Sequence, residues 1–162
     1  MKFLALDVGK RRIGVASCDR LEIAANPHSI IPGGREAMAS IVRLVETEGA
    51  EGLVVGLPLS MDGTERTACA WVREFIERLT PMISVPIYLV DERYTTKIAE
   101  ASLIEAGKRR EQRRDLRDAV AAALILQTFI DRRRFEDESR KHQDVSETVV
   151  IDDETHKSSN RL

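Results

Sequence analysis

The sequence predicts one α/β domain, built on a mixed five-stranded sheet flanked by helices and followed by a disordered acidic C-terminal tail. Three observations predict this arrangement. Short apolar segments of strand type alternate with longer segments of helical periodicity, the first two strands are joined by a tight turn, and apolar periodicity stops after Arg134. A chain of 162 residues, 43% of them hydrophobic, can bury one sizeable core.

The N-terminal part is expected to form a hairpin, a third strand and a helix. Lys2–Asp7 and Arg12–Ser17 are short apolar runs with a tight turn between them, which indicates an antiparallel hairpin. Ala24–Ile31 is a weaker strand. Arg35–Glu48 has apolar residues at helical spacing, and Gly49 is expected to be its C-terminal cap.

Alternating strands and helices follow. Gly52–Gly56 is wholly apolar, which is typical of a strand covered on both faces. The later segments are, in order, a helix over Thr64–Leu79, a strand over Pro86–Val90, a helix from Thr95 or Thr96 to about Ala106, and a long helix over Arg114–Asp131. An opening hairpin that leads into alternating strands and helices implies a mixed sheet with helices on its faces, the topology of the ribonuclease H-like fold.

The net charge of −2 conceals an uneven distribution. From Glu136 to the end, eight acids stand against four bases. We therefore expect a folded domain over residues 1–135, with a net charge of +2, and a flexible charged tail over residues 136–162. Within the domain the bases cluster over residues 10–12, 108–117 and 132–134, so it can present basic patches despite its small net charge.

Several function classes have no support in the sequence. No segment has the roughly 18 uninterrupted apolar residues of a membrane span, and the N-terminus lacks the apolar region of a signal peptide. Cys18 and Cys69 lack metal-ligand spacing, so we expect reduced thiols in a cytoplasmic protein. The glycines form neither of the common nucleotide-binding loops.

Three acidic residues stand at the ends of apolar segments far apart in the sequence: Asp7, Glu92 and Asp118. A carboxylate that ends a buried strand needs a cation, a proton or a hydrogen-bond donor. If the three converge, they form a site for a hard divalent cation, which prefers carboxylate oxygens. Simpler interpretations are a turn residue for Asp7, an ion-pair partner for Glu92, and a charge that favours the start of a helix for Asp118.

Other carboxylates compete for places in this site. Asp91 and Glu92 are adjacent at a strand end, so their side chains point to opposite faces and only one should reach the site. Asp115 lies three residues before Asp118 and shares its helix face. Asp62 lies in a loop. The residues alone leave these alternatives open.

Four blocks closely resemble the signature of a known family. They are Asp7–Ala16, Val54–Glu65, Asp91–Thr96 and Asp118–Gln127. In this order they resemble the YqgF/RuvX family of bacterial Holliday-junction resolvases, which is also implicated in maturing the 5′ end of 16S ribosomal RNA. The resemblance covers about residues 2 to 131 and excludes the tail.

The resemblance implies a metal-dependent endonuclease that cleaves structured nucleic acid, either branched DNA or precursor rRNA. Asp7, Glu92 and Asp118 would be its catalytic residues and would bind Mg²⁺ or Mn²⁺. The residues expected to contact phosphates are Lys10, Arg11, Arg93, Arg109, Arg110 and Arg114. With aromatics at only 4%, we expect recognition of shape and backbone. Branched DNA would suit a symmetric homodimer, and precursor rRNA a monomer that works with the ribosome.

One departure favours an alternative function. Related resolvases carry their second carboxylate on the fourth strand, whereas Leu53–Pro58 has none. The alternative is a noncatalytic nucleic-acid- or ribosome-associated binding protein on the same fold.

Overall fold

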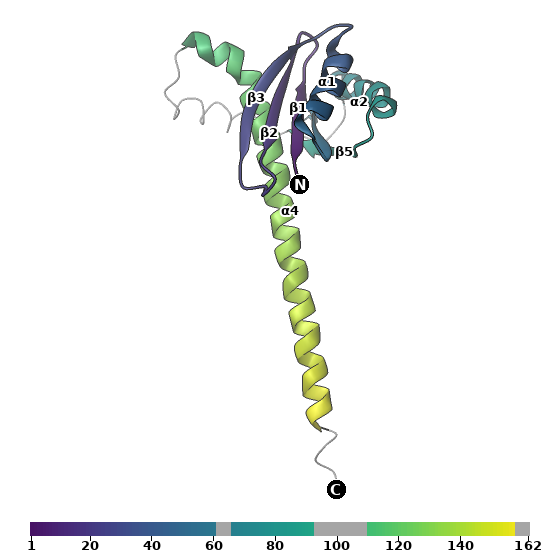
Figure 1. Cartoon of the computed structure of the whole chain (residues 1–162), viewed down its shortest axis with the longest axis vertical. Helices are drawn as coiled ribbons and strands as arrows, with labels where there is room; N and C mark the ends of the chain where they lie inside the picture. Colours follow the sequence, from purple (N-terminus) through teal and green to yellow (C-terminus); the bar gives the residue numbers. More distant parts are fainter. Residues whose placement is uncertain (61–65, 93–109, 158–162) are drawn as a thin grey trace. The chain divides into compact units, whose positions relative to one another are not determined.

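A mixed sheet of five strands organises the fold (Figure 1). The elements are β1 (Phe3–Val8), β2 (Arg12–Cys18), β3 (Ala25–Pro32), α1 (Ala37–Glu48), β4 (Gly52–Leu57), α2 (Thr67–Leu79), the 3₁₀ turn η1 (Thr80–Met82), β5 (Ile87–Asp91) and α4 (Arg110–Lys157). This computed structural model describes residues 1–60, 66–92 and 110–157, with the side chains of α4 described over residues 117–142. The strand order is β3-β2-β1-β4-β5. β2 is antiparallel to both its neighbours, and β1, β4 and β5 are parallel.

A tight turn joins β1 to β2. The N–H of Gly9 donates to the carbonyl oxygen of Arg12 at 3.0 Å. A Cβ at position 9 would lie 2.6 Å from that oxygen, so the turn requires glycine. The N–H of Gly33 donates to the carbonyl oxygen of Arg11 at 2.7 Å. The loop between β3 and α1 therefore lies against the hairpin turn.

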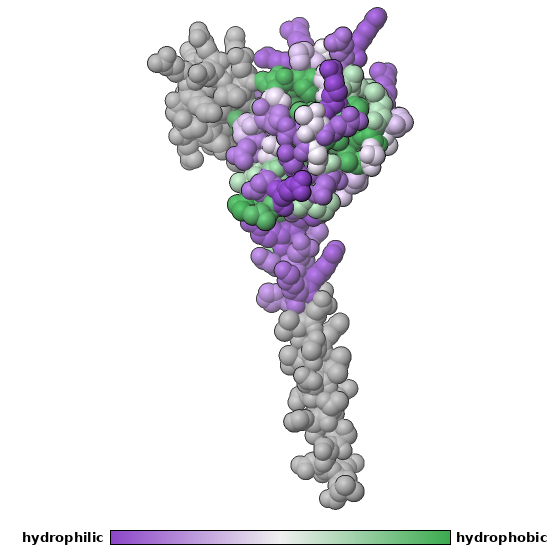
Figure 2. All heavy atoms as spheres, viewed as in Figure 1, coloured by the Kyte–Doolittle hydropathy of each residue, from purple (hydrophilic) through white to green (hydrophobic). Residues whose placement is uncertain are grey.

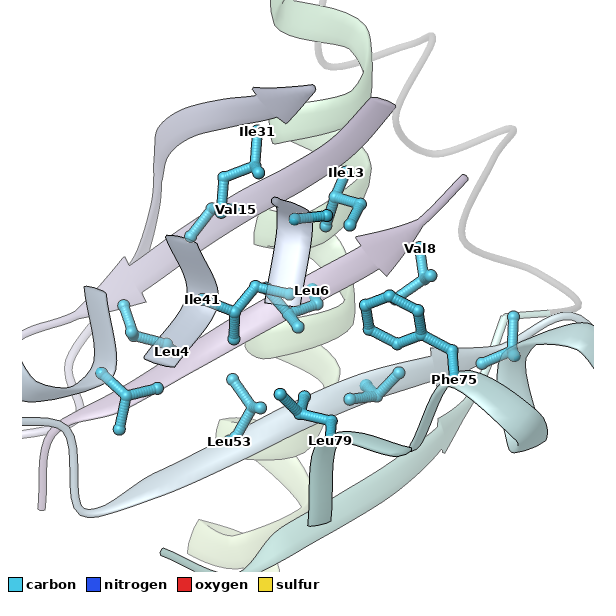
Figure 3. Packing of buried hydrophobic residues seen from close by; sticks show 14 of the residues in the cluster. Leu4, Leu6, Val8, Ile13, Val15, Ile31, Ile41, Leu53, Phe75 and Leu79 are labelled. Carbon is cyan, nitrogen blue, oxygen red and sulfur yellow. The ribbon is translucent and has the colours of Figure 1, made fainter. Parts of the chain in front are cut away.

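Strand alternation gives the sheet two buried faces. Leu4, Leu6 and Val8 of β1 point to the face that α1 and α2 cover, whereas Phe3 and Ala5 point to the opposite face. Figure 3 shows the first face, where aliphatic residues of the sheet pack against helix residues that include Ile41, Phe75 and Leu79. This face holds the larger of the two buried clusters in the described part of the chain.

The second face packs against α4, which passes behind the sheet in Figure 3. Its buried members on the helix are Ala122, Ala123, Ile125, Leu126 and Ile130. The ring of Phe129 meets that of Phe3 edge-on, with centroids 5.0 Å apart. The side-chain carbonyl of Gln127 accepts a hydrogen bond from the N–H of Ala25 at 3.0 Å. Apolar packing and this polar contact together fix the first half of α4 on the sheet.

The order of strands and helices expected from the sequence is confirmed over the described residues, and each strand boundary agrees within one residue. α1 begins at Ala37 and α2 at Thr67, each slightly later than expected. The short 3₁₀ turn η1 directly follows α2 and was not among the elements expected from the sequence. The helix expected between Thr95 and Ala106 lies outside the described residues.

The last helix extends well beyond Asp131, where the sequence predicts its end, and continues to Lys157. By its contacts the chain divides into the compact units Met1–Ile130 and Asp131–Leu162. The described side chains of the second unit are exposed or half-buried and largely hydrophilic (Figure 2), and Phe135 is 72% exposed. The prediction of a disordered tail rests on the loss of apolar periodicity, which leaves the helix with no apolar face to pack. Arg, Glu and Lys nevertheless have high helix propensity, so a helix can continue there. No helix in the described segments is both long and apolar enough to cross a membrane.

Candidate active site

Asp7 reaches the α4 side of the sheet because of its place in β1. Phe3 and Ala5 belong to the buried cluster beneath α4, and Asp7 continues this row of alternate residues. Asp7 pairs across the hairpin with Gly14. The row thus ends in a carboxylate at the carboxyl end of β1, beside the point where α4 crosses β2.

Glu92 reaches the same side by the same alternation. Tyr88 and Val90 pack in the cluster beneath α4, and Glu92 is the next residue of that row. Its N–H donates to the carbonyl oxygen of Leu57 at 3.1 Å, which continues the pairing of β5 with β4 past Asp91. Asp91 belongs to the opposite row. Of the two adjacent acids, Glu92 is the one that meets Asp7.

The carboxyl groups of Asp7 and Glu92 are hydrogen-bonded to each other. Burial, followed by the charge of Asp118, raises the pKa of Asp7 to about 6. Burial, then the charge of Asp7 and the hydrogen bond to it, raises the pKa of Glu92 to about 8. At neutral pH the protonated Glu92 therefore donates to the Asp7 carboxylate, and the two acids share one negative charge.

Asp118 joins this pair from α4. It lies one and four residues before the buried Ala119 and Ala122, so it extends the stripe by which the helix packs on the sheet. A Cβ at Gly14 would collide with the backbone carbonyl of Asp118, so β2 and α4 approach backbone to backbone here. The Nε of Arg12 lies 3.7 Å from Oδ2 of Asp118, and the two side chains are 50% and 32% exposed.

The donor set suits a hard divalent cation. Oxygen ligands of this kind are preferred by Mg²⁺ and Mn²⁺, and a cation beside Asp7 and Glu92 would favour their charged forms over the shared proton. As placed, however, no three Asp, Glu, His or Cys side chains among the described residues are close enough to hold one ion. Asp7, Glu92 and Asp118 therefore offer the kind of ligand atom that a divalent cation prefers. Their side chains would have to move for all three to bind one ion.

Of the six predicted phosphate contacts, the structure describes the side chains of Lys10 and Arg11. Lys10 and Arg11 are exposed on the β1–β2 turn that follows Asp7. Arg93, Arg109 and Asp62 lie outside the described residues, and so do the side chains of Arg110, Arg114 and Asp115.

Three residues of the site were not predicted from the sequence: Arg12, Gly14 and Gly56. Gly14 and Gly56 carry no chemistry of their own but make room for Asp118 and Glu92. A signal for both was present. Gly14 lies inside the expected strand Arg12–Ser17 and Gly56 ends the expected strand Gly52–Gly56, and a glycine in a strand often marks a close approach by another group.

The mixed sheet brings Asp7 and Glu92 together where β1 and β5 end, and Asp118 of α4 lies near enough to influence them electrostatically. Oxygen donors of this kind are compatible with a metal-dependent nuclease. The chain belongs to the RuvX family, because the family model described as "RuvX: Holliday junction resolvase" matches residues 1–132. Membership in this nuclease family makes the chain a hydrolase that acts on phosphodiester bonds.

Curated relatives match the chain over nearly their whole length. One from Roseiflexus sp. (strain RS-1), named "Putative pre-16S rRNA nuclease", is 42% identical over 135 residues, which are 82% of this chain and 96% of the relative. One of the same name from Lactobacillus delbrueckii subsp. bulgaricus is 41% identical over 142 residues, which are 84% of this chain and all of the relative.

Two solved structures share the fold at low sequence identity. T. thermophilus RuvC in complex with a Holliday junction substrate aligns with a TM-score of 0.51 and 17% identity, over 77% of this chain and 91% of RuvC. Fowlpox virus resolvase in complex with Holliday junction DNA aligns with a TM-score of 0.54 and 10% identity, over 81% of this chain and 97% of the resolvase. These likenesses support the ribonuclease H-like architecture.

Proposed function

We propose that the protein is a metal-dependent endonuclease in which Asp7, Glu92 and Asp118 hold one or two Mg²⁺ or Mn²⁺ ions. The observation that carries this proposal is the hydrogen bond between Asp7 and Glu92 beneath the helix that bears Asp118. Burial of two carboxyl groups side by side costs folding free energy, and groups with pKa values perturbed in this way cluster at functional sites. When bound, the divalent ion supplies activation of water and stabilisation of the leaving oxygen.

The residues of the chain supply position and charge. Asp7 and Glu92 lie at strand ends, so their backbones are fixed by the sheet. Displacement of the proton that they share gives the site one more negative charge for the cation. Lys10 and Arg11, on the turn that Gly9 closes, hold the nucleic-acid backbone beside these carboxylates. Arg93, Arg109, Arg110 and Arg114 extend this contact in the proposal.

We favour precursor 16S rRNA as the substrate, because the relatives above 40% identity carry that name. Branched DNA is the rival, supported by the family description and by the two resolvase structures. Cleavage of rRNA needs only a monomer working with the ribosome. Cleavage of a junction needs two opposed sites, hence a homodimer. The free thiols of Cys18 and Cys69 fit a cytoplasmic location.

A cleavage assay on both substrates tests the proposal. Wild type is incubated with a precursor 16S rRNA fragment or a four-way DNA junction, with Mg²⁺ or Mn²⁺, beside Asp7→Asn and Asp118→Asn. Glu77→Gln, an acid-to-amide change at an exposed position of α2, is the matched control.

We expect wild type and the control to cleave the rRNA fragment and both site variants to lose cleavage by at least about a hundredfold. Equal cleavage by all four proteins would exclude this site. Binding without cleavage under every condition would instead support the noncatalytic nucleic-acid- or ribosome-associated protein.

A further inference from the structure

Arg12 forms an ion pair with Asp118, one of the three proposed metal ligands. Its Nε lies 3.7 Å from Oδ2 of Asp118. The side chain remains half exposed, so the pair is open to solvent and weak. A guanidinium in contact through one nitrogen at this distance keeps its other donors available.

Both partners of this pair have well-fixed backbones. The carbonyl oxygen of Arg12 accepts the Gly9 N–H at 3.0 Å, which closes the turn after Asp7. Two residues further along β2, Gly14 touches the backbone of Asp118. Any rearrangement between Arg12 and Asp118 is therefore confined to their side chains.

We propose that Arg12 pairs with Asp118 in the ligand-free site and turns to a substrate phosphate when a divalent cation takes its place beside Asp118. This inference rests on the proposed function and adds a phosphate-binding residue to it. A cation that approaches Asp118 repels the guanidinium. The phosphate that arrives with the nucleic acid offers two oxygens in the geometry that Arg binds best. Arg12 thus weakens the binding of the divalent cation when nucleic acid is absent and strengthens it when nucleic acid is bound.

Binding of Mn²⁺ alone separates this role from a structural one. Titration calorimetry with Mn²⁺ is carried out on wild type, Arg12→Gln, Arg12→Lys and, as matched control, Arg43→Gln at an exposed position of α1. Loss of a neighbouring positive charge should make Arg12→Gln bind Mn²⁺ roughly three- to tenfold more tightly than wild type. Arg12→Lys keeps the charge, so its Mn²⁺ affinity should stay near that of wild type.

Loss of the Arg12 guanidinium should weaken the binding of the nucleic-acid substrate. With Mn²⁺ saturating, Arg12→Gln and Arg12→Lys should both show a KM for the cleaved nucleic acid raised about fivefold or more, because neither offers a two-pronged donor. Arg43→Gln should match wild type in both measurements. Equal thermal unfolding temperatures establish that all variants are folded.

The results distinguish a failure of the proposed role of Arg12 from a failure of the proposed nuclease function. If wild type binds Mn²⁺ and cleaves, Asp118→Asn loses both, and Arg12→Gln binds Mn²⁺ no more tightly than Arg43→Gln, the role of Arg12 is wrong and the nuclease site stands. If wild type neither binds Mn²⁺ nor cleaves, the proposed function itself fails, and this inference fails with it.

Discussion

The carboxylate of Glu92 occupies the volume that a side chain at Gly56 would need. A Cβ at position 56 would collide with Oε1 of Glu92 and would lie 2.5 Å from Cδ1 of Ile125 on α4. Gly56 belongs to the row of β4 that faces α4, two residues after the buried Val54. At this point β4 contributes space and the end of β5 contributes the carboxylate. The lack of an acid on the fourth strand is thus compatible with a complete set of three carboxylates.

Substitution of Gly56 by alanine should therefore disable the site through Glu92. The added methyl group meets the carboxyl group and the packed Ile125, so overpacking should lower the free energy of unfolding by about 1–3 kcal/mol. Displacement of Glu92 should lower kcat at least about tenfold. Urea denaturation and the cleavage assay measure the two effects.

A double variant separates this contact from a general effect on β4. Gly56→Ala combined with Glu92→Ala removes the carboxylate that the new methyl group meets, so the two stability changes should not add. The double variant should be more stable than additivity predicts, yet inactive. Strict additivity would show that Gly56 does not act through Glu92.

Gly14 should be less tolerant of alanine than Gly56. A Cβ there would collide with the carbonyl group of Asp118 and lie 2.8 Å from the N of Ala119. These are backbone atoms of a packed helix, which cannot turn aside as a side chain can. We expect Gly14→Ala to lower the free energy of unfolding by about 3 kcal/mol or more. A loss below about 1 kcal/mol in urea denaturation would contradict the close packing of β2 on α4.

Stability without divalent metal should fall as pH rises from about 4 to about 8. The pKa of Asp7 is raised from 3.8 to about 6 and that of Glu92 from 4.5 to about 8. Between the unfolded and folded values the native state binds more protons, so each increase in pH favours unfolding. This loss of stability is absent below the pKa values of the unfolded state and complete above the pKa values of the folded state.

Chemical denaturation in EDTA at pH 5 and pH 8.5 measures this dependence. Glu92→Gln should be more stable than wild type at pH 8.5 and should show a shallower pH dependence, because its amide cannot ionise. Addition of Mn²⁺ should restore the stability of wild type at pH 8.5 if the carboxylates bind it. Wild type that is more stable at pH 8.5 than at pH 5 in EDTA would contradict the raised pKa values.

The sequence was sufficient to predict the strands and to place Asp7 at the end of β1, because alternate residues of a strand point to opposite faces of the sheet. The same rule applied to Tyr88, Val90 and Glu92 selects Glu92 over Asp91, provided that the face covered by α4 is known. That face depends on tertiary packing, which a single strand does not encode. The contacts at Gly14 and Gly56 have the same origin, since both involve residues far away in the sequence. The length of α4 was missed because helix propensity persists where apolar periodicity ends.

Removal of the acidic tail should strengthen nucleic-acid binding without weakening the fold. Residues 136–162 carry a net charge of −4, whereas the remainder carries +2. The described side chains from Glu136 to His142 are exposed, so a chain that ends at Phe135 should unfold at the same urea concentration as the full chain. Its affinity for an rRNA fragment should rise severalfold at low salt, and this gain should disappear above roughly 0.3 M salt because the effect is electrostatic. Replacement of Glu136, Asp137 and Glu138 by their amides in the full-length chain is the matched control, and it should give part of the gain. A gain from truncation that persists at high salt, with none from the amide variant, would assign the effect to chain length instead of charge.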